Sequence, residues 1–299
     1  MATQDIAFLS ATELGSAIKA KQVSPVEVVE AYLDRIERID PQVNSYITVM
    51  AEYARQEALE AEATIRRGDY LGPLPGVPLA IKDQIYTKDI RTSSASKIRT
   101  DFLPDVDASV VSGLRRSGAI ILGKLNMTEF ASGAGDPYKY GDPPRNPWNL
   151  ELDPGSSSTG SGIAIAASLC MNAIGEDTGG SIRGPASANG IVGLRPTWGL
   201  VSRFGVGTLS WSMDAPGPMT RTVEDAARLL QVVSGYDQLD PNTSKRKVPN
   251  YMLLLKGDLK NIRIGVINEF VEPGHTDLET IEAVNAAISK FRELGAQVS

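Results

Sequence analysis

The sequence predicts an α/β fold with a mixed, mostly parallel central sheet that helices cover on both faces. Three observations favour this class. Short apolar runs alternate with helical patterns along the 299 residues. The composition, 42% hydrophobic and 22% charged, is that of an ordinary globular chain. The sequence shows no internal repeat and no low-complexity tract, so we expect a single large domain over residues 1–299.

The first seventy residues have helical patterns. Ser10 and Ser24 are each followed three residues later by a glutamate, which is the capping-box pattern of a helix start. The stretch 51–67 is rich in alanine and glutamate, which are good helix formers. We therefore expect an N-terminal helical region over about residues 1–70.

The pattern changes after the Gly- and Pro-rich stretch 72–76. Beyond it we expect strands over 77–83, 119–124 and 262–266, helices over 108–117, 160–171, 222–234 and 278–294, and a strand and turn over 190–201. Residues 295–299 look like a helix stop followed by the start of a strand. We therefore expect that the C-terminal part of the fold is missing from this chain.

Charge and cysteine content narrow the class of protein. The net charge is −6 and no block of Lys or Arg is present, so we expect no direct nucleic-acid partner. The one cysteine, Cys170, excludes an internal disulfide, and we expect it to pack inside a helix. The N-terminus lacks a signal-peptide pattern, and the apolar stretch 162–171 is too short to cross a bilayer. These observations indicate a cytoplasmic protein without a membrane partner.

The single histidine, His275, lies in the turn-like stretch E-P-G-H-T-D. We interpret it as an exposed loop residue. Any serine chemistry in this chain is therefore expected to use a base other than histidine.

Two serine patterns are weak signals. The stretch 155–161 has the glycine spacing of a phosphate-binding loop, but Ser161 stands where that loop needs a lysine. The stretch 94–97 fits S-x-x-K, yet the chain has no K-T-G to accompany it. The G-x-S-x-G pattern of common hydrolases is absent as well.

A stronger signal is the combination of Lys82, Ser157 and Ser181. Taken singly, a lysine at a strand end is usually solvated, a serine-rich run is usually a linker or a helix cap, and G-G-S is usually a turn. Together they suggest more, because a long apolar helix follows the serine run and helix starts offer free N–H groups. Gly179 and Gly180 carry no side chain, so a carbonyl oxygen could approach their N–H groups closely.

Four motifs resemble those of the amidase signature family. They are G-V-P-L-A-I-K-D (76–83), P-G-S-S-S-T-G-S-G (154–162), G-E-D-T-G-G-S-I-R-G-P-A (175–186) and G-I-V-G-L-R-P-T (190–197). Their order and spacing agree with the family, and the resemblance runs from about Thr12 to the last residue.

The serine-rich loop departs from the family pattern. Ser156 and Thr159 stand where the family usually has glycine. Counting back from Ser181 identifies the middle serine as Ser157, and Ser158 remains the alternative.

The resemblance implies the amidase signature fold and a Ser–Ser–Lys triad. Ser181 would be the nucleophile, and Ser157, held by the family in a cis peptide, would relay its proton to Lys82. Burial among the apolar residues of its strand would lower the pKa of Lys82 and so make it a base.

The resemblance also implies the surroundings of the triad. The oxyanion would be bound by backbone N–H groups of Thr178, Gly179 and Gly180, with that of Ser181 beside them. Ala131 and Ser157 would contact the substrate. We expect Asp177 and Arg183 to form an ion pair that braces the loop around Ser181, which we call the nucleophile loop.

The leading functional prediction is a stand-alone amidase that hydrolyses linear amides, at C–N bonds other than peptide bonds, to acid and amine. It would need no cofactor and no metal. Its partner would be a small-molecule amide substrate, and assembly into a homodimer is left as an open alternative. One alternative is the A subunit of a glutamine-dependent tRNA amidotransferase, which the departures in the serine-rich loop disfavour. Another is a scaffold of the same fold without catalysis.

Overall fold

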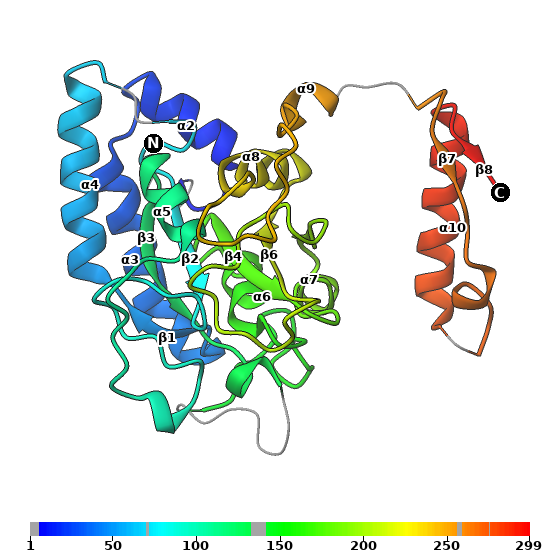
Figure 1. The fold of residues 1–299 in the computed structure, drawn as a ribbon, viewed down its shortest axis with the longest axis horizontal. Helices are drawn as coiled ribbons and strands as arrows, with labels where there is room; N and C mark the ends of the chain where they lie inside the picture. The colour runs from blue at the N-terminus through cyan, green and yellow to red at the C-terminus, as the bar shows by residue number, and fades with distance from the viewer. Residues whose placement is uncertain (1–5, 70–71, 133–141, 256–258, 275) are drawn as a thin grey trace. The chain divides into compact units, whose positions relative to one another are not determined.

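The computed structural model describes residues 6–69, 72–132, 142–255, 259–274 and 276–299, shown in Figure 1. Its contacts group the chain into two compact units, Met1–Pro249 and Asn250–Ser299, and each is described by itself. The single domain expected over 1–299 stays a prediction. The interpretation of His275 as a loop residue falls outside the described residues.

A six-stranded sheet in the order β1-β3-β2-β4-β6-β5 forms the centre of the first unit, as far as its residues are described. Its strands are β1 (Tyr46–Val49), β2 (Pro78–Lys82), β3 (Ile120–Leu125), β4 (Asn172–Asp177), β5 (Val192–Gly193) and β6 (Ala215–Thr220). β2 pairs in parallel with β3 and β4 at the middle of the sheet, whereas the pairs toward both edges are antiparallel. This mixed sheet with its helices confirms the α/β class.

The three central strands are buried along their whole length. Parallel strands have this character because helices cover them. Lys82 is the last residue of β2 and is therefore carried into the interior.

The first unit also contains helices, most of which contact strands of this sheet. They are α2 (Ala11–Lys19), α3 (Pro25–Val43), α4 (Ala51–Arg66), α5 (Ser109–Arg116), α6 (Thr159–Ala166), α7 (Arg183–Asn189) and α8 (Val223–Val233). α3 and α4 lie side by side, and α4 also contacts β3 (Figure 1). α6 contacts β2, β3, β4 and β6, so its N-terminus is placed near the middle of the sheet.

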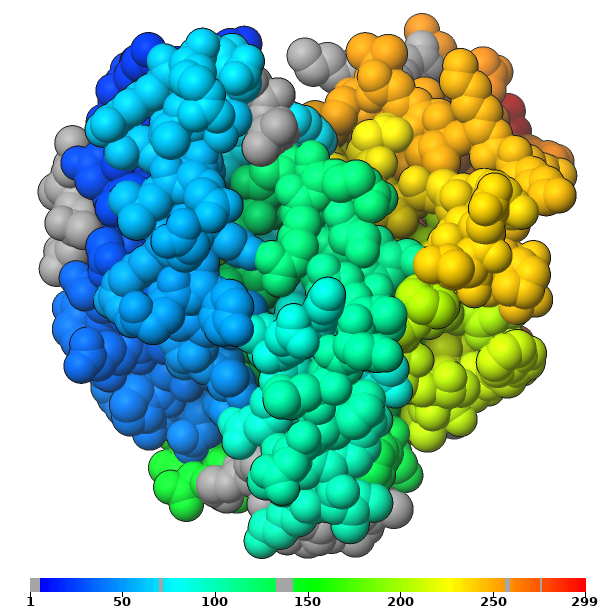
Figure 2. Space-filling view, turned by 60° about the vertical axis from the view of Figure 1, so that its left-hand side comes forward, coloured from blue at the N-terminus to red at the C-terminus, as the bar shows by residue number. Residues whose placement is uncertain are grey.

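Both capping boxes expected near the N-terminus are present, at the starts of α2 and α3, and β1 lies between α3 and α4. The N-terminal helical region over about residues 1–70 stays a prediction as a part of the domain. Ser10 and Ser24 each accept a hydrogen bond from the backbone of a glutamate three residues on, and the side chain of that glutamate accepts one from the backbone N–H of the cap. Figure 2 shows the surface where α4 meets the later segment that contains α5. Glu57 of α4 pairs there with Arg115 and accepts from the Ile121 N–H of β3 at 3.1 Å.

One expectation of local structure was wrong, and three strands were missed. The helix expected over 160–171 is α6, which ends at Ala166 because Ser168 adopts a left-handed φ of 57° and turns the chain toward β4. The strands β1, β4 and β6 were not anticipated. β4 reads N-A-I-G-E-D and is half polar, and β6 reads A-P-G-P-M-T, whose prolines are unusual in a strand.

The second unit contains α9 (Tyr251–Leu254), β7 (Arg263–Ile264), the 3₁₀ turn η3 (Asn268–Phe270), α10 (Leu278–Glu293) and β8 (Gln297–Val298). β7 and β8 pair in parallel. The strand expected over 262–266 and the helix expected over 278–294 are both confirmed. Throughout the described ranges, no helix combines the length and apolar character needed to cross a membrane.

Candidate active site

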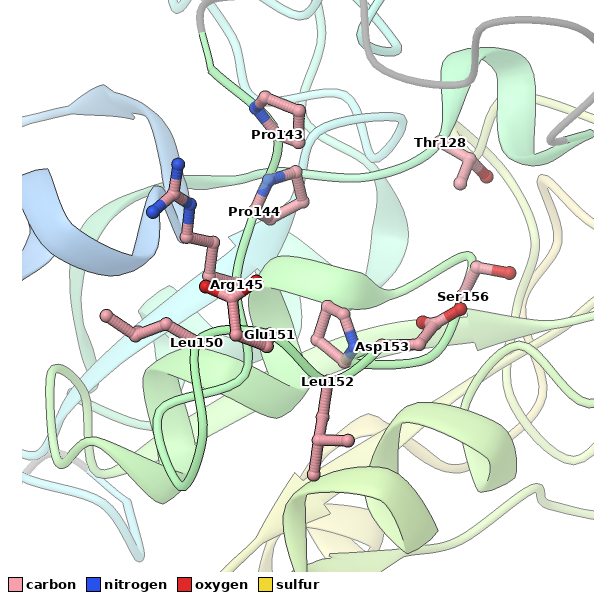
Figure 3. A pocket seen from close by; sticks show the side chains of 10 residues that line it. Thr128, Pro143, Pro144, Arg145, Leu150, Glu151, Leu152, Asp153 and Ser156 are labelled. Carbon is pink, nitrogen blue, oxygen red and sulfur yellow. The ribbon is translucent and has the colours of Figure 1, made fainter.

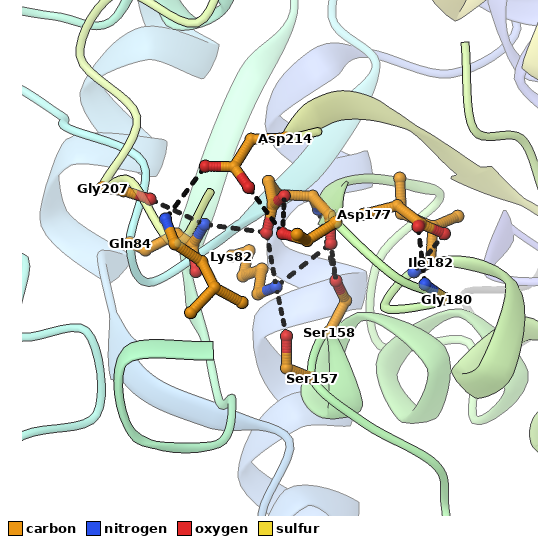
Figure 4. Close-up of polar contacts among 12 residues, drawn as sticks. Lys82, Gln84, Ser157, Ser158, Asp177, Gly180, Ile182, Gly207 and Asp214 are labelled. Carbon is orange, nitrogen blue, oxygen red and sulfur yellow. Dashed lines mark hydrogen bonds and ion pairs between the residues drawn. The ribbon is translucent and has the colours of Figure 1, made fainter. Parts of the chain in front are cut away.

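Lys82 is fully buried at the carboxyl end of β2. Its Nζ lies 2.8 Å from Ser157 Oγ, 3.2 Å from the Glu176 carbonyl oxygen and 3.4 Å from Glu176 Oε2. Figure 4 shows these contacts converging on the amine. Of the three residues predicted to form the triad, Lys82 and Ser157 are therefore in direct contact.

Burial lowers the pKa of Lys82 below its ordinary value, because an ammonium ion loses its hydration in the interior. Negative charge on the neighbouring carboxyl groups of Glu176, Asp177 and Asp214 would act in the opposite direction, without cancelling this effect. The site therefore favours the neutral amine more than water does, as the sequence led us to expect.

The serine-rich loop presents Ser157, not Ser158, to the lysine. The Ser156–Ser157 peptide bond is cis. The Ser158 hydroxyl is occupied elsewhere, since it donates to the Glu176 carbonyl at 3.1 Å and accepts from the Glu176 N–H at 3.2 Å. This geometry favours Ser157 as the bridging serine and gives Ser158 a role in holding the loop to β4.

Ser181 lies in the loop 178–182 between β4 and α7 and is half-buried. Its carbonyl accepts from the Ser158 N–H at 3.1 Å, which ties the nucleophile loop to the serine-rich loop. Within the described part of the chain, no hydrogen bond joins the hydroxyls of Ser157 and Ser181. The structure thus brings the two loops together but leaves that last contact open.

Asp177 organises the nucleophile loop from the end of β4. Its carboxylate accepts from the backbone N–H groups of Gly180 (2.7 Å), Ile182 (3.1 Å) and Arg183 (3.3 Å). It also pairs with the Arg183 guanidinium at 3.0 Å and with Arg195 at 3.4 Å. Burial tends to raise the pKa of Asp177, but these hydrogen bonds outweigh it and hold the pKa below its usual value. The expected Asp177–Arg183 brace is present.

The two glycines of the loop face open space. A Cβ added at Gly179 or Gly180 would meet nothing within 4 Å, and Gly180 has a φ of +130° that side chains rarely adopt. The Gly180 N–H already donates to Asp177. In this structure Gly179 and Ser181 are therefore better placed than Gly180 to offer an N–H to a substrate.

Ala131 lies in the 3₁₀ turn η2 (Glu129–Ala131) that follows β3. It is buried with Ala95 and Met127, and its φ of 60° is left-handed. Its N–H donates to the Thr128 carbonyl at 2.9 Å. A contact of Ala131 with substrate remains a prediction.

A pocket of about 540 Å³ borders the serine-rich loop (Figure 3). Thr128 and Ser156 lie at one end, and the remaining lining comes from two proline-containing segments, 143–145 and 150–154. Because Ser156 directly precedes Ser157, this pocket is a candidate route for a small molecule toward the triad.

The sequence did not reveal that polar side chains gather beside Lys82, among them the buried Gln84, Glu176 and Asp214. Glu176 Oε2 accepts from Gln84 Nε2 at 3.0 Å, and the Thr178 hydroxyl lies between Glu176 Oε1 (2.9 Å) and Asp214 Oδ1 (2.6 Å). The available signal was a glutamate inside an apolar stretch, A-I-G-E-D, but its burial follows only once β4 is recognised as a strand. No group of three or more metal-ligating side chains occurs among the described residues.

Several curated relatives that match nearly the whole chain share one name. The A subunit of the glutamyl-tRNA(Gln) amidotransferase of Geobacter metallireducens is 47% identical over 289 residues, which is 97% of this chain and 59% of that protein. The chain spans about 60% of the length of the first curated relatives that it matches.

Solved structures that share this fold carry different names. The native peptide amidase from Stenotrophomonas maltophilia superimposes with a TM-score of 0.89 at 36% identity, over 98% of this chain and 61% of that one. The A subunit of the glutamyl-tRNA(Gln) amidotransferase from Thermotoga maritima gives a TM-score of 0.84 at 33% identity, over 98% and 61%.

These relatives correct two predictions. The stand-alone amidase was the wrong leading choice, because the curated relatives that match nearly the whole chain are amidotransferase subunits. The prediction that the partner is a small-molecule amide, with a homodimer left open, is wrong for the same reason. Ser156 and Thr159 do not exclude an amidotransferase subunit, because neither residue disturbs the contact between Lys82 and Ser157.

The amidase family model matches residues 27–299, a range that contains Lys82, Ser157 and Ser181. The match includes the central sheet and the loops that carry the candidate site. The chain belongs to the amidase family.

Proposed function

We propose that this chain is the amidase part of a glutamine-dependent tRNA amidotransferase, in which it hydrolyses glutamine to glutamate and ammonia. The 2.8 Å contact between Lys82 Nζ and Ser157 Oγ in a fully buried setting supports the amide hydrolysis. The relatives named as amidotransferase subunits support glutamine as the substrate.

In the proposed reaction Ser181 attacks the amide carbon. Its proton passes to Ser157 while the Ser157 proton passes to the neutral amine of Lys82, so that the amine becomes an ammonium ion. The relay then runs backwards, and the proton reaches the leaving nitrogen, which departs as ammonia. Water enters by the same route and releases glutamate from the acyl-enzyme.

Backbone N–H groups of the nucleophile loop would bind the oxyanion that forms on attack. The sequence pointed to Thr178, Gly179 and Gly180. Because the Gly180 N–H donates to Asp177, we infer that the N–H groups of Gly179 and Ser181 bind the oxyanion. Each well-placed donor lowers such a barrier by roughly 3 kcal/mol.

Other subunits would complete the activity. The relatives are named as subunits of an amidotransferase, so we infer that ammonia released here is used by a partner protein. Purification of the tagged chain from its native cells tests this inference, because the partner proteins should be retained with it. A chain that is recovered alone and that hydrolyses glutamine without any response to glutamyl-tRNA would contradict the proposed assembly.

The catalytic residue is tested by Ser181→Ala. Wild type should release ammonia from glutamine and should react at Ser181 with a fluorophosphonate probe. The variant should lose both, with a fall in rate of roughly 1,000-fold or more. Ser187→Ala is the matched control, since Ser187 is an exposed serine of α7 in the same region of the chain. Hydrolysis of other amides with glutamine left untouched would contradict the proposed substrate, and full activity of Ser181→Ala would contradict the mechanism.

A further inference from the structure

Beside Lys82, the side-chain oxygens of Glu176, Thr178 and Asp214 make two close contacts, but the three groups share only one hydroxyl proton if both carboxyl groups are ionised. The Thr178 oxygen lies 2.9 Å from Glu176 Oε1 and 2.6 Å from Asp214 Oδ1. A hydroxyl carries one proton, and an ionised carboxylate carries none. If both carboxyl groups were ionised, one of the two contacts would press lone pairs together in the buried interior, because Glu176 and Asp214 are both buried.

One additional proton on this chain of oxygens removes the conflict. We propose that Glu176 is held as a neutral carboxylic acid, which donates to Thr178 while Thr178 donates to Asp214, and that it thereby leaves Lys82 without an ionised partner. This proposal rests on the function proposed above, in which Lys82 is the base.

The backbone decides which carboxyl group holds the proton. Asp214 accepts from the N–H groups of Leu209 and Ser210, each at 2.9 Å, and such donors stabilise the charged form. Glu176 Oε1 contacts the Thr178 hydroxyl, and among the described residues no backbone N–H donates to the Glu176 carboxyl group. The proton therefore belongs on Glu176, and the negative charge belongs on Asp214.

The distances around the lysine agree with a neutral glutamic acid. Lys82 Nζ lies 3.4 Å from Glu176 Oε2, whereas charge-assisted N–H···O bonds are about 2.7–2.9 Å long. Its short contact, 2.8 Å, is with Ser157. A neutral amine has two N–H donors and one lone pair, which suits the two Glu176 oxygens and the Ser157 hydroxyl respectively.

Other charged groups do not change this assignment. Successive residues of a strand point to opposite faces, so Asp177 is directed away from Glu176 into the nucleophile loop, where it pairs with Arg183 at 3.0 Å. Gln84 faces Glu176 Oε2 as a neutral donor at 3.0 Å. The titratable groups that face Glu176 are therefore Lys82 and, through Thr178, Asp214.

The proposal makes Glu176 a positioning residue for the base. A glutamate ionised beside Lys82 would hold the amine as an ammonium ion, which cannot accept the Ser157 proton. As a neutral acid, Glu176 accepts an N–H from Lys82 and keeps its own proton on the Thr178 side throughout the reaction. All the protons that move belong to the serines, the lysine and the leaving group.

The direct test is an infrared difference spectrum of wild type against Glu176→Gln near neutral pH. A neutral carboxylic acid has a carbonyl band separate from that of a carboxylate, and we expect wild type to show one such band that the variant lacks. Glu62→Gln is the matched control, since Glu62 is a partly covered glutamate of α4 in an ordinary ion pair with Arg66. A spectrum in which Glu176→Gln loses only carboxylate absorption overturns the proposal.

The second test follows the pH dependence of fluorophosphonate labelling at Ser181. Thr178→Val removes the acceptor for the Glu176 proton, so the glutamate ionises, the lysine keeps its proton longer, and the acid limb of the labelling rate should move up by about one pH unit. Adding Glu176→Gln should reverse that shift, because no carboxyl group is left to ionise. A double variant that keeps the displaced limb overturns the proposal.

The two readouts separate this inference from the proposed function. If wild type shows the infrared band of a carboxylic acid but does not react with the fluorophosphonate at any pH, Ser181 is not the nucleophile, and the neutral Glu176 is still supported. A wild type that labels normally but has no acid band keeps the proposed function and overturns the inference.

Discussion

Among the residues that the structure describes, two lysines are fully buried, and their surroundings suggest different roles. Lys82 ends β2 and contacts a serine hydroxyl and Glu176. Lys124, in β3, donates to the Ile85 carbonyl and to the hydroxyls of Thr87 (3.2 Å) and Thr92 (2.9 Å). Lys124 therefore holds the segment that follows β2 against the sheet, whereas Lys82 has a proton acceptor and donor within reach.

Lys124 makes stability depend on pH. Burial lowers its pKa to about 8, although the charge of Asp83 opposes the shift. Between pH 8 and the ordinary lysine value the unfolded chain binds a proton that the folded chain does not, so stability rises with pH there by up to about 1.4 kcal/mol per unit. Below pH 8 both states are protonated and this contribution is constant.

We expect Lys124→Met to remove that rise. The measurement is the free energy of unfolding by urea for wild type and variant between pH 7.5 and 10, and the difference between them should grow in favour of wild type as the pH increases. Lys97→Met, at an exposed lysine of η1 (Lys97–Arg99), is the control and should show a flat difference. A flat difference for Lys124→Met as well would rule out the buried amine as the cause.

At the scale of single residues, the motifs of the sequence pointed to Lys82, Ser157, Asp177 and Ser181, and the structure gathers them into two adjoining loops. Their roles in the reaction remain predictions. The sequence could not point to Glu176, because its importance comes from contacts with residues on other elements. Such contacts follow from the pairing of strands and have no local pattern.

At the scale of elements, α6 sets the position of the serine-rich loop. The helix begins at Thr159, two residues after Ser157. A Cβ at Gly160 would run into backbone atoms of Ser45 and Asn126 that real Cβ atoms do not approach so closely. This glycine lets the helix lie directly on the chain at the ends of β1 and β3.

We expect Gly160→Ala to destabilise the protein by at least about 2 kcal/mol, because the colliding atoms are backbone and cannot rotate away. Gly15→Ala is the matched control. Gly15 is a helical glycine of α2 with no atom near an added Cβ, so alanine there should stabilise by about 0.5–1 kcal/mol. Chemical denaturation of both variants measures this, and a neutral Gly160→Ala would show that the close contact does not constrain α6.

The elements that the sequence predicted were those with clear apolar periods or caps, such as α3 and β2. β4 was missed because its composition serves the site and the sheet at once, and β6 was missed because prolines are unusual in a strand. β4 ends in Glu176 and Asp177, which face the lysine and the nucleophile loop, so polar residues interrupt its apolar pattern. The polar residues that β4 contributes to the candidate site therefore obscured its strand pattern in the sequence.

At the scale of the whole molecule, the candidate site joins three distant parts of the chain. β2 supplies the amine, the start of α6 supplies Ser157, and the loop after β4 supplies Ser181. β2 and β4 are neighbours in the sheet, and the serine-rich loop is bonded to β4 through Ser158. The resemblance predicted this fold, whereas the choice between a stand-alone enzyme and one component of a larger assembly had no physical basis in the residues that we weighed.

The central claim is that a buried, uncharged lysine activates a serine on another loop through a second hydroxyl. It is tested most directly by the rate at which a fluorophosphonate labels Ser181 from pH 5 to 10 in wild type and in Lys82→Met. Wild type should label fast near neutral pH and slow toward acid as one group is protonated. Lys82→Met should be slower by roughly 100-fold or more, with that acid limb lost. A variant that labels as fast as wild type, with the same dependence on pH, would contradict the account.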